Sequence, residues 1–222
     1  MTSADGSRGI LDLGAVRSLY DRLARGYDLM TAPHRAIGGY RLVDRAVEEL
    51  GLRRGATVVD LGTGTGYALP ALAARVGPTG RVIGIDISSK MLGRARERCR
   101  QEVLANVQLV QADIATYRLP QGTGAVLSAF AMEMLPDHAD VIADLAGQLP
   151  AGSRMAVTGM REPEGWPEWL VRLGAVLNRP FGVTEAYRSH RPWEPMEQHT
   201  SDTTYTEILG GVVYLSVGTV WA

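Results

Sequence analysis

Three glycines at alternate positions form the part of the chain that is best suited to ligand binding. Gly62, Gly64 and Gly66 directly follow an apolar run, residues 58–61, and precede a stretch with helical composition, residues 67–76. Because glycine lacks a Cβ, such a turn adopts conformations that other residues resist and leaves room for a ligand against backbone N–H groups. The order strand, glycine turn, helix therefore predicts a binding turn.

The glycine spacing excludes two common nucleotide motifs. A nicotinamide or flavin dinucleotide requires G-x-G-x-x-G. The residue at the position that this pattern needs is Tyr67 when counted from Gly62, and Leu69 when counted from Gly64. The P-loop is excluded as well, because no Gly-Lys-Ser/Thr follows. What remains is an Asp-x-Gly-x-Gly-x-Gly pattern that begins at Asp60.

Two further acids end the next apolar runs. Asp86 lies about 20 residues after Gly66, a distance that takes the chain through one helix and up the next strand, where a carboxylate suits the hydroxyls of a ribose. A carboxylate also repels phosphate, so an unphosphorylated nucleoside is favoured. Asp113 could accept a hydrogen bond from an exocyclic amine such as that of adenine. The alternative is that these acids only cap helices.

Composition limits the function further. A chain of 222 residues with 45% hydrophobic residues predicts one domain with a small cap, and a net charge of −1 gives no electrostatic case for nucleic acid as a partner. The single cysteine, Cys99, excludes an internal disulfide and a multi-cysteine metal site, and its helical spacing predicts a buried core thiol. With no signal-like segment and no apolar run long enough to span a bilayer, we expect a cytoplasmic protein without a metal.

Alternating strands and helices must position these residues. We expect strands at 58–61, 81–86, 107–113, 125–130 and 154–160 with helices between them, the pattern of a doubly wound, mostly parallel α/β sheet. A C-terminal β-hairpin, 203–209 with 212–220, brings the predicted sheet to seven strands. Ligands in such sheets bind beyond the carboxyl ends of the strands, where Asp60, Asp86, Asp113 and Ser128 are expected.

The segments that flank this core differ in character. We expect residues 1–9 to be a disordered tail and residues 10–222 to be one domain. Helices at 11–27 and 40–50 belong to a predicted helical cap, 10–52, over the ligand crevice. Residues 161–200 hold three of the four tryptophans, Trp166, Trp169 and Trp193, and we expect a substrate-side insertion there with one helix at 167–177 and otherwise irregular structure.

The successive motifs resemble those of class I S-adenosylmethionine-dependent methyltransferases. The matching motifs are residues 60–66, 84–86 and 112–113, and residues 19–30, 34–35, 80–92 and 210–218 are similar to the UbiE/COQ5-like branch. The resemblance implies a Rossmann-like methyltransferase that binds S-adenosyl-L-methionine and releases S-adenosyl-L-homocysteine. It implies that the three glycines face the methionine portion, Asp86 the ribose and Asp113 the adenine amine. The other cofactor-binding residues implied are Tyr20, Tyr27, Asp60, Thr63, Ile87, Met91, Ala112, Ile114 and Ser128.

The acceptor is less well specified. Residues 128–136 lack the Phe-Gly-x-Arg-Asn run of the quinone enzymes, so we expect a small apolar or aromatic acceptor, which could be quinone-like, phenolic or a natural product, methylated on carbon or oxygen. His34, His138 and His190, with Glu133 behind them, are candidate bases, although surface or helix-start roles explain them too. The alternative function is to bind the cofactor without transferring methyl, using it for cyclisation or rearrangement. The sequence leaves a homodimer open.

Overall fold

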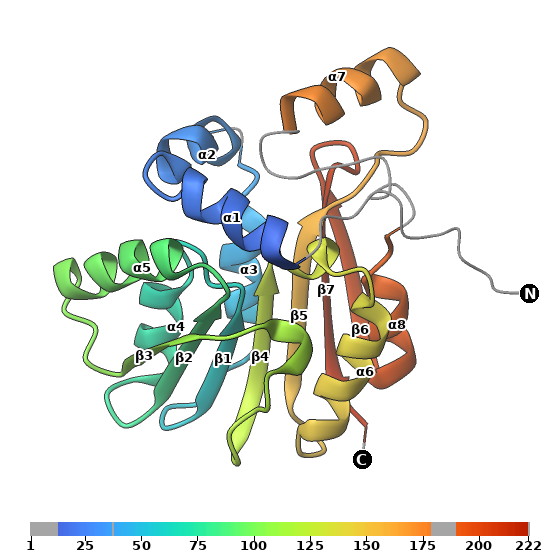
Figure 1. The fold of residues 1–222 in the computed structure, drawn as a ribbon. Helices are drawn as coiled ribbons and strands as arrows, with labels where there is room; N and C mark the ends of the chain where they lie inside the picture. The colour runs from blue at the N-terminus through green and yellow to red at the C-terminus, as the bar shows by residue number, and fades with distance from the viewer. Residues whose placement is uncertain (1–12, 37, 179–189, 222) are drawn as a thin grey trace, which may run out of the picture.

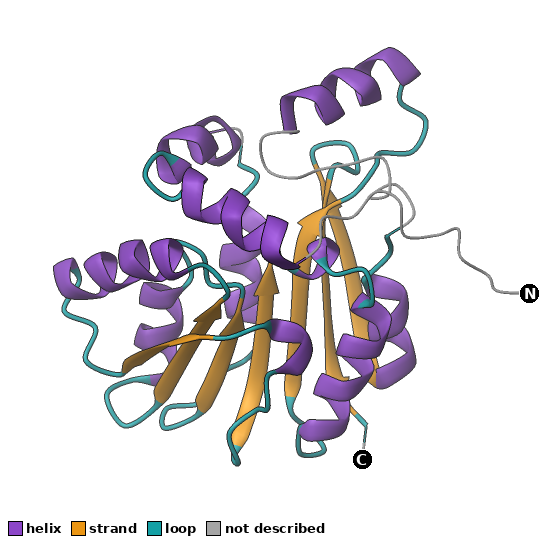
Figure 2. Cartoon of the chain, in the orientation of Figure 1, coloured by secondary structure: helices purple, strands orange, loops and turns teal. Residues whose placement is uncertain are grey.

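The computed structural model describes residues 13–36, 38–178 and 190–221, with one central sheet between layers of helices (Figure 2). Five parallel strands follow the apolar runs: β1 (Thr57–Leu61), β2 (Arg81–Asp86), β3 (Val107–Gln111), β4 (Thr123–Ala129) and β5 (Arg154–Met160). A hairpin of β6 (Thr200–Ile208) and β7 (Val213–Val220) completes the sheet, with β7 antiparallel to β5. The predicted seven-stranded, mostly parallel α/β fold with a C-terminal hairpin is confirmed.

Both faces of the sheet are covered, which explains why its central strands read as continuous apolar runs. One face packs against α3 (Arg41–Glu49), α4 (Leu69–Val76) and α5 (Ser89–Gln101) through residues such as Leu42, Leu72 and Ala95. The other face packs against α6 (His138–Gln148) and α8 (Trp193–His199) through Ile142 and Met196. The strand ends are thereby fixed from both sides.

The strand order is β3-β2-β1-β4-β5-β7-β6. The chain runs outward from β1 to β3 and then returns to β4 beside β1, so the direction of winding reverses between these two strands. Ligands in open α/β sheets bind at such a switch point, outside the carboxyl ends of the strands. The glycine turn follows β1 directly, at this point.

Two helices lie over this edge of the sheet, α1 (Leu13–Leu23) and α2 (Tyr27–Ala36) (Figure 1). The predicted single helix over 11–27 was wrong at its end. The chain turns at residues 24–26, where the Gly26 N–H donates to the Leu23 carbonyl at 3.0 Å, and a second helix follows that the sequence reasoning missed. The helix predicted at 40–50 is confirmed as α3.

The C-terminal half also departs from expectation in places. The predicted helix at 167–177 forms as α7 (Glu168–Asn178), but α8 lies in a stretch predicted to be irregular. β6 starts at Thr200, three residues earlier than predicted, with a register shift between Ser201 and Thr204. The predicted tail, residues 1–9, and part of the predicted insertion, residues 179–189, lie outside the described residues.

Cys99 is half-buried at the edge of the core, so the prediction of a buried thiol was wrong. The helical spacing that suggested burial is the i, i+4 series Met91, Ala95, Cys99 and Val103. The helix, α5, ends at Gln101, and Val103 beyond it is 83% exposed with a φ of 54°.

Candidate functional site

The glycine turn depends on its three glycines for conformation and for space. Gly62, Gly64 and Gly66 have φ of 70°, 56° and 81°, the left-handed region that side chains disfavour. A Cβ on Gly62 would collide with the Cβ of Ala131, and one on Gly66 would lie 2.8 Å from Leu69. At Gly64 only the Gly62 carbonyl lies within 4 Å, so its open side is available to a ligand.

Asp86 ties the end of β2 to this turn. Its Oδ2 accepts a hydrogen bond from the Gly64 N–H at 2.9 Å, and its Oδ1 accepts one from the Ser88 N–H at 2.8 Å. Burial raises the pKa of Asp86 to about 6, although both hydrogen bonds oppose the rise. A carboxylate that keeps lone pairs free at a strand end is an acceptor for hydroxyl groups.

Asp60, at the end of β1, supports the same turn from beneath. It is 2% exposed, and its Oδ2 accepts a hydrogen bond from the Thr63 hydroxyl at 2.6 Å. Burial raises the pKa of Asp60 to about 6, and the Thr63 bond acts in the opposite direction. Two partly desolvated acids therefore flank the glycines.

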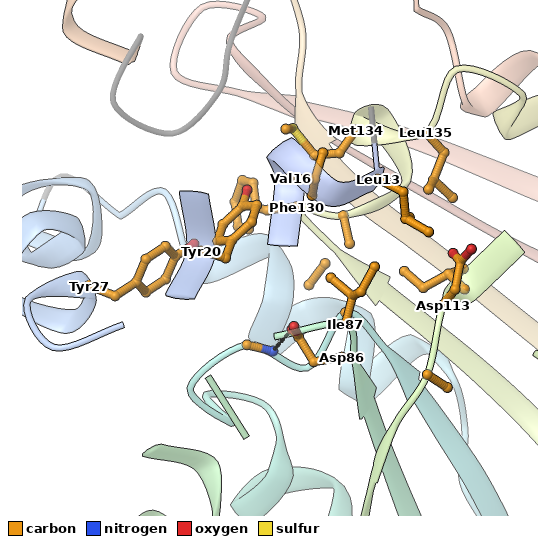
Figure 3. Close-up of a pocket in the computed structure, with 16 residues that line it drawn as sticks. Leu13, Val16, Tyr20, Tyr27, Asp86, Ile87, Asp113, Phe130, Met134 and Leu135 are labelled. Atoms are coloured by element: carbon orange, nitrogen blue, oxygen red, sulfur yellow. Dashed lines mark hydrogen bonds between the residues drawn. The ribbon is translucent and has the colours of Figure 1, made fainter. Parts of the chain in front are cut away.

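A cleft of about 640 Å³ opens above Asp86 (Figure 3). Asp113 lies at one end, and Tyr20, Tyr27 and Phe130 lie at the other, with Asp86 between them. The predicted residues that line it are Tyr20, Tyr27, Gly62, Gly64, Asp86, Ile87, Ala112, Asp113 and Ile114, joined by Leu13, Val16, Ala129, Phe130, Ala131, Met134 and Leu135.

A second hollow, about 430 Å³, lies against the other side of the glycine turn. Asp60 and Thr63 line it, together with an aromatic group, Tyr40, Tyr67 and Phe130, that the sequence reasoning missed. The Tyr40 ring lies 4.5 Å from the Tyr67 ring and 5.5 Å from the Phe130 ring, between centroids. Tyr40 directly precedes α3, Tyr67 lies just before α4 and Phe130 directly follows β4, so only the fold brings them together.

Phe130 lines both spaces and has a φ of 56°. A bulky residue in this conformation is strained by an amount of order 1–3 kcal/mol, and such strain is concentrated at functional sites. Its N–H donates to the Thr158 carbonyl at 2.8 Å, which helps to hold the strained backbone in place. No sequence signal marks a positive φ at a phenylalanine.

Three predicted cofactor residues line neither space. Met91 is a buried core residue of α5, and Gly66 packs against Ala95. Ser128 is fully buried in β4, and its hydroxyl has no hydrogen-bond partner among the residues that the structure describes.

Three of the four candidate bases come together. Glu133 belongs to a short 3₁₀ helix, Met132–Met134, and its Oε1 accepts a hydrogen bond from the Met160 N–H at 3.0 Å. The His190 Nδ1 lies 3.1 Å from the Glu133 carbonyl, and the rings of His138 and His190 are 4.6 Å apart. Burial, followed by the nearby His190, lowers the pKa of His138. None of the three lines the cleft, and His34 lies apart on α2.

The two cleft tyrosines are donors and not bases. Burial raises the pKa of Tyr20 well above its usual value, and the nearby Glu133 carboxylate adds to the rise. Burial likewise raises the pKa of Tyr27, with Tyr20 as the next contribution. Both phenols therefore keep their protons at neutral pH.

The tryptophans are not on the walls of this cleft. Trp166 and Trp193 line a separate hollow of about 770 Å³ with Arg161, His190 and Arg191, and Trp169 is 65% exposed. None of the three therefore lines the cleft at the glycine turn.

Within residues 13–36, 38–178 and 190–221, no helix is long and apolar enough to cross a membrane. The same residues contain no cluster of three or more histidine, cysteine, aspartate or glutamate side chains arranged to hold a metal ion.

Comparisons with known proteins agree with this geometry. Residues 58–152 match a family model described as a methyltransferase domain. The ubiquinone/menaquinone biosynthesis C-methyltransferase UbiE of Erwinia tasmaniensis is 29% identical over 91% of this chain and 89% of its own length. The nocamycin O-methyltransferase of Saccharothrix syringae is 32% identical over 72% of this chain and 57% of its own length.

Among solved structures, a chain from the complex of the Haloferax volcanii Trm112 methyltransferase activator with a methyltransferase has a TM-score of 0.71. It is 19% identical and covers 93% of this chain and 98% of that one, a likeness that concerns the fold alone. The glycine turn, open at Gly64 and bordered by the Asp86 carboxylate, fits S-adenosylmethionine as the cofactor. The chain is a class I S-adenosylmethionine-dependent methyltransferase, similar within that class to the UbiE enzymes.

Proposed function

We propose that the cleft holds the adenosine of S-adenosylmethionine, with Asp86 on the ribose hydroxyls and Asp113 on the adenine amine. The observation that carries this proposal is the Asp86 carboxylate itself, which is fixed at the switch point by Gly64 and Ser88 and faces the cleft. Asp113 is held in a similar way, because its Oδ1 accepts a hydrogen bond from the Ala115 N–H at 3.0 Å.

The methionine portion then extends along the glycine turn toward the second hollow. Asp60 and Thr63 line that hollow. A buried carboxylate there suits the ammonium group of an amino acid. Tyr20 and Tyr27 cover the cofactor from the cap. The remaining residues in the proposed cofactor set are Gly62, Gly64, Ile87, Ala112 and Ile114; Gly66, Met91 and Ser128 support the turn and strand ends from behind.

The acceptor in this proposal is small and either apolar or aromatic. Apolar side chains make up much of the cleft wall, among them Val16, Phe130 and Met134, and few of its polar groups are charged. The named relatives act as a C-methyltransferase and an O-methyltransferase, which supports methylation of a ring carbon or a hydroxyl on a quinone-like, phenolic or natural-product acceptor.

When bound, S-adenosylmethionine supplies a methyl group that its sulfonium has already activated. The chain's part is to align the acceptor with that methyl and to exclude water, effects worth about 7–11 kcal/mol when the geometry is good. Phe130 and Tyr40 wall the approach, and the neutral phenols of Tyr20 and Tyr27 orient oxygen atoms by donating hydrogen bonds.

An acceptor that must lose a proton needs a base. We propose Glu133 for this role; its carboxylate lies behind the cleft wall and does not line the cleft. Its carboxylate is buried near Tyr20 on the loop after β4, between Ala131 and Met134, two residues that line the cleft. His190 contacts this loop through the Glu133 carbonyl, and the His138 ring lies against the His190 ring. The alternative of binding without transfer is not favoured, because the relatives reported above are methyltransferases.

The test is to incubate the protein with methyl-labelled S-adenosylmethionine and a panel of quinols, catechols and naphthols. We expect S-adenosylhomocysteine to accumulate with turnover and one product to gain one labelled methyl group. At a cofactor concentration below saturation, we expect Asp86→Asn to lower both about 100-fold. Cofactor binding without product from any acceptor class in the panel would contradict the proposed acceptor.

A further inference from the structure

The cap helices α1 and α2 each carry a tyrosine followed by an aspartate. The tyrosine of each pair lines the cleft, and the aspartate attaches its helix to the core of the domain. Tyr20 precedes Asp21 in α1, and Tyr27 precedes Asp28 in α2. Each tyrosine lines the cleft, and each aspartate bonds to the core next to a residue of the cofactor site. The side chains of neighbouring residues on a helix point about 100° apart. The same helix turn can therefore direct the tyrosine into the cleft and the aspartate toward the core.

Asp21 attaches α1 to the residue that also holds Asp86. Its Oδ1 accepts hydrogen bonds from the Ser88 hydroxyl at 2.5 Å and from the Lys90 N–H at 3.3 Å. Ser88 is the N-cap of α5, where its hydroxyl also accepts from the Met91 N–H at 3.1 Å. A carboxylate at a helix N-terminus is favourable, since the first N–H groups have no partner within the helix.

Asp28 attaches α2 to the glycine turn. Its Oδ1 accepts a hydrogen bond from the Thr65 hydroxyl at 2.7 Å, and its Oδ2 lies 3.4 Å from the Arg98 Nη2. Arg98 in turn donates from Nε to the Thr65 carbonyl at 3.0 Å, so that Asp28 and Arg98 hold both ends of a residue between Gly64 and Gly66.

These attachments matter because none of the residues of α1, 13–23, is fully buried. A free helix of 11 residues is marginal in water, and helices are normally stabilised by burying an apolar face. The contacts of Asp21 and Asp28 therefore help to hold the helices that carry Tyr20 and Tyr27 over the cleft.

We infer that Asp21 and Asp28 are positioning residues that couple closure of the cap to occupancy of the cofactor site. This inference rests on the proposed function, because it takes the adenosine to lie between the cap tyrosines and the turn. A cofactor that touches both the cap and the glycine turn stabilises the closed cap. By reciprocity, a variant whose cap is closed for a smaller fraction of the time binds the cofactor with an affinity lowered in the same proportion.

The test measures S-adenosylhomocysteine affinity by calorimetry and hydrogen exchange of residues 13–36 with and without this ligand. We expect ligand to slow exchange in 13–36 of the wild type, and Asp21→Ala or Asp28→Ala to lose about 10-fold in affinity each, with faster exchange confined to that segment. Arg22→Ala, at an exposed position on the same helix, is the matched control and should change neither value.

A second pair of variants separates the hydrogen bond from general damage. Thr65→Val removes the hydroxyl that Asp28 accepts and should behave like Asp28→Ala, whereas Thr65→Ser keeps it and should restore wild-type affinity. Affinity within twofold of wild type in Asp21→Ala and Asp28→Ala would overturn the inference, as would faster exchange throughout β1 and β4. No binding by the wild type would instead contradict the proposed function.

Discussion

Replacing Asp86 by asparagine should weaken S-adenosylhomocysteine binding about 100-fold while leaving the fold intact. The carboxylate accepts hydrogen bonds from Gly64 and Ser88 and, in the proposed complex, from two ribose hydroxyls. Asparagine has nearly the same shape but only one acceptor oxygen. Its NH₂ group would therefore face hydrogen-bond donors where aspartate has its second oxygen. Hydrogen bonds to a charged group contribute about 1.5–3 kcal/mol each, and losing two at the lower figure costs about 3 kcal/mol, a factor of about 100.

The pH dependence of binding provides an independent check on the same residue. Burial raises the pKa of Asp86 to about 6, and donors such as hydroxyls favour the ionised form. Binding to the wild type should therefore weaken as the pH falls below about 6, by about tenfold at pH 5 relative to pH 8. Asp60 has a similar pKa, so some dependence remains in Asp86→Asn, but the part due to Asp86 disappears.

Calorimetric titration with S-adenosylhomocysteine at about pH 5 and pH 8 measures both effects, with thermal unfolding as the check on the fold. A buried charge with a raised pKa lowers the stability of the folded state at neutral pH. The unfolding temperature of the asparagine variant at pH 7 should therefore not lie far below that of wild type. An affinity within threefold of wild type, or an identical pH dependence in the two proteins, would refute the assignment of Asp86 to the ribose.

Three further outcomes follow from the site. Burial raises the pKa of Asp60 from 3.8 to about 6, so this group binds a proton more readily when folded and its contribution makes the protein less stable as the pH rises from about 4 to 6. Asp60→Asn should remove up to about 3 kcal/mol of that loss, as measured by urea unfolding at pH 4 and pH 7, and an unchanged difference between the two pH values would contradict the burial argument. Gly62→Ala should destabilise the fold by about 2–3 kcal/mol and abolish cofactor binding, because of the positive φ of Gly62 and the collision with Ala131. The control is Gly93→Ala on α5, where an added Cβ meets no atom within 4 Å, and it should be neutral or stabilise the fold by up to about 1 kcal/mol. Equal effects of the two substitutions on stability would show that the glycine turn is not tightly constrained. Glu133→Gln should lower kcat for a proton-bearing acceptor about 100-fold with cofactor affinity unchanged, and a kcat near that of wild type would remove Glu133 as a base.

The strands and their terminal acids could be predicted because local rules fix them. Residues 58–61 and 82–86 are buried on both faces, which makes them mostly apolar, and the glycines that follow residue 61 have the φ values that require glycine. The N-cap of α5 was equally local, since Ser88 caps through its own side chain. These features place the cofactor end of the site.

The rest depends on contacts between segments far apart in sequence. Arg98 looks like one member of an exposed arginine series until α2 places Asp28 beside it. His190 and Glu133 are separated by 57 residues and meet only because the chain after α7 returns to the loop after β4. The strained backbone of Phe130 is set by its tertiary neighbours, and no local pattern reports it.

The most direct test of the cofactor assignment is a crystal structure with S-adenosylhomocysteine bound. We predict that both ribose hydroxyls lie within about 3.2 Å of the Asp86 carboxylate oxygens, that the adenine amine faces Asp113, and that Tyr20 and Tyr27 cover the ligand. A ligand bound elsewhere, or one in this cleft whose ribose does not contact Asp86, would contradict the account.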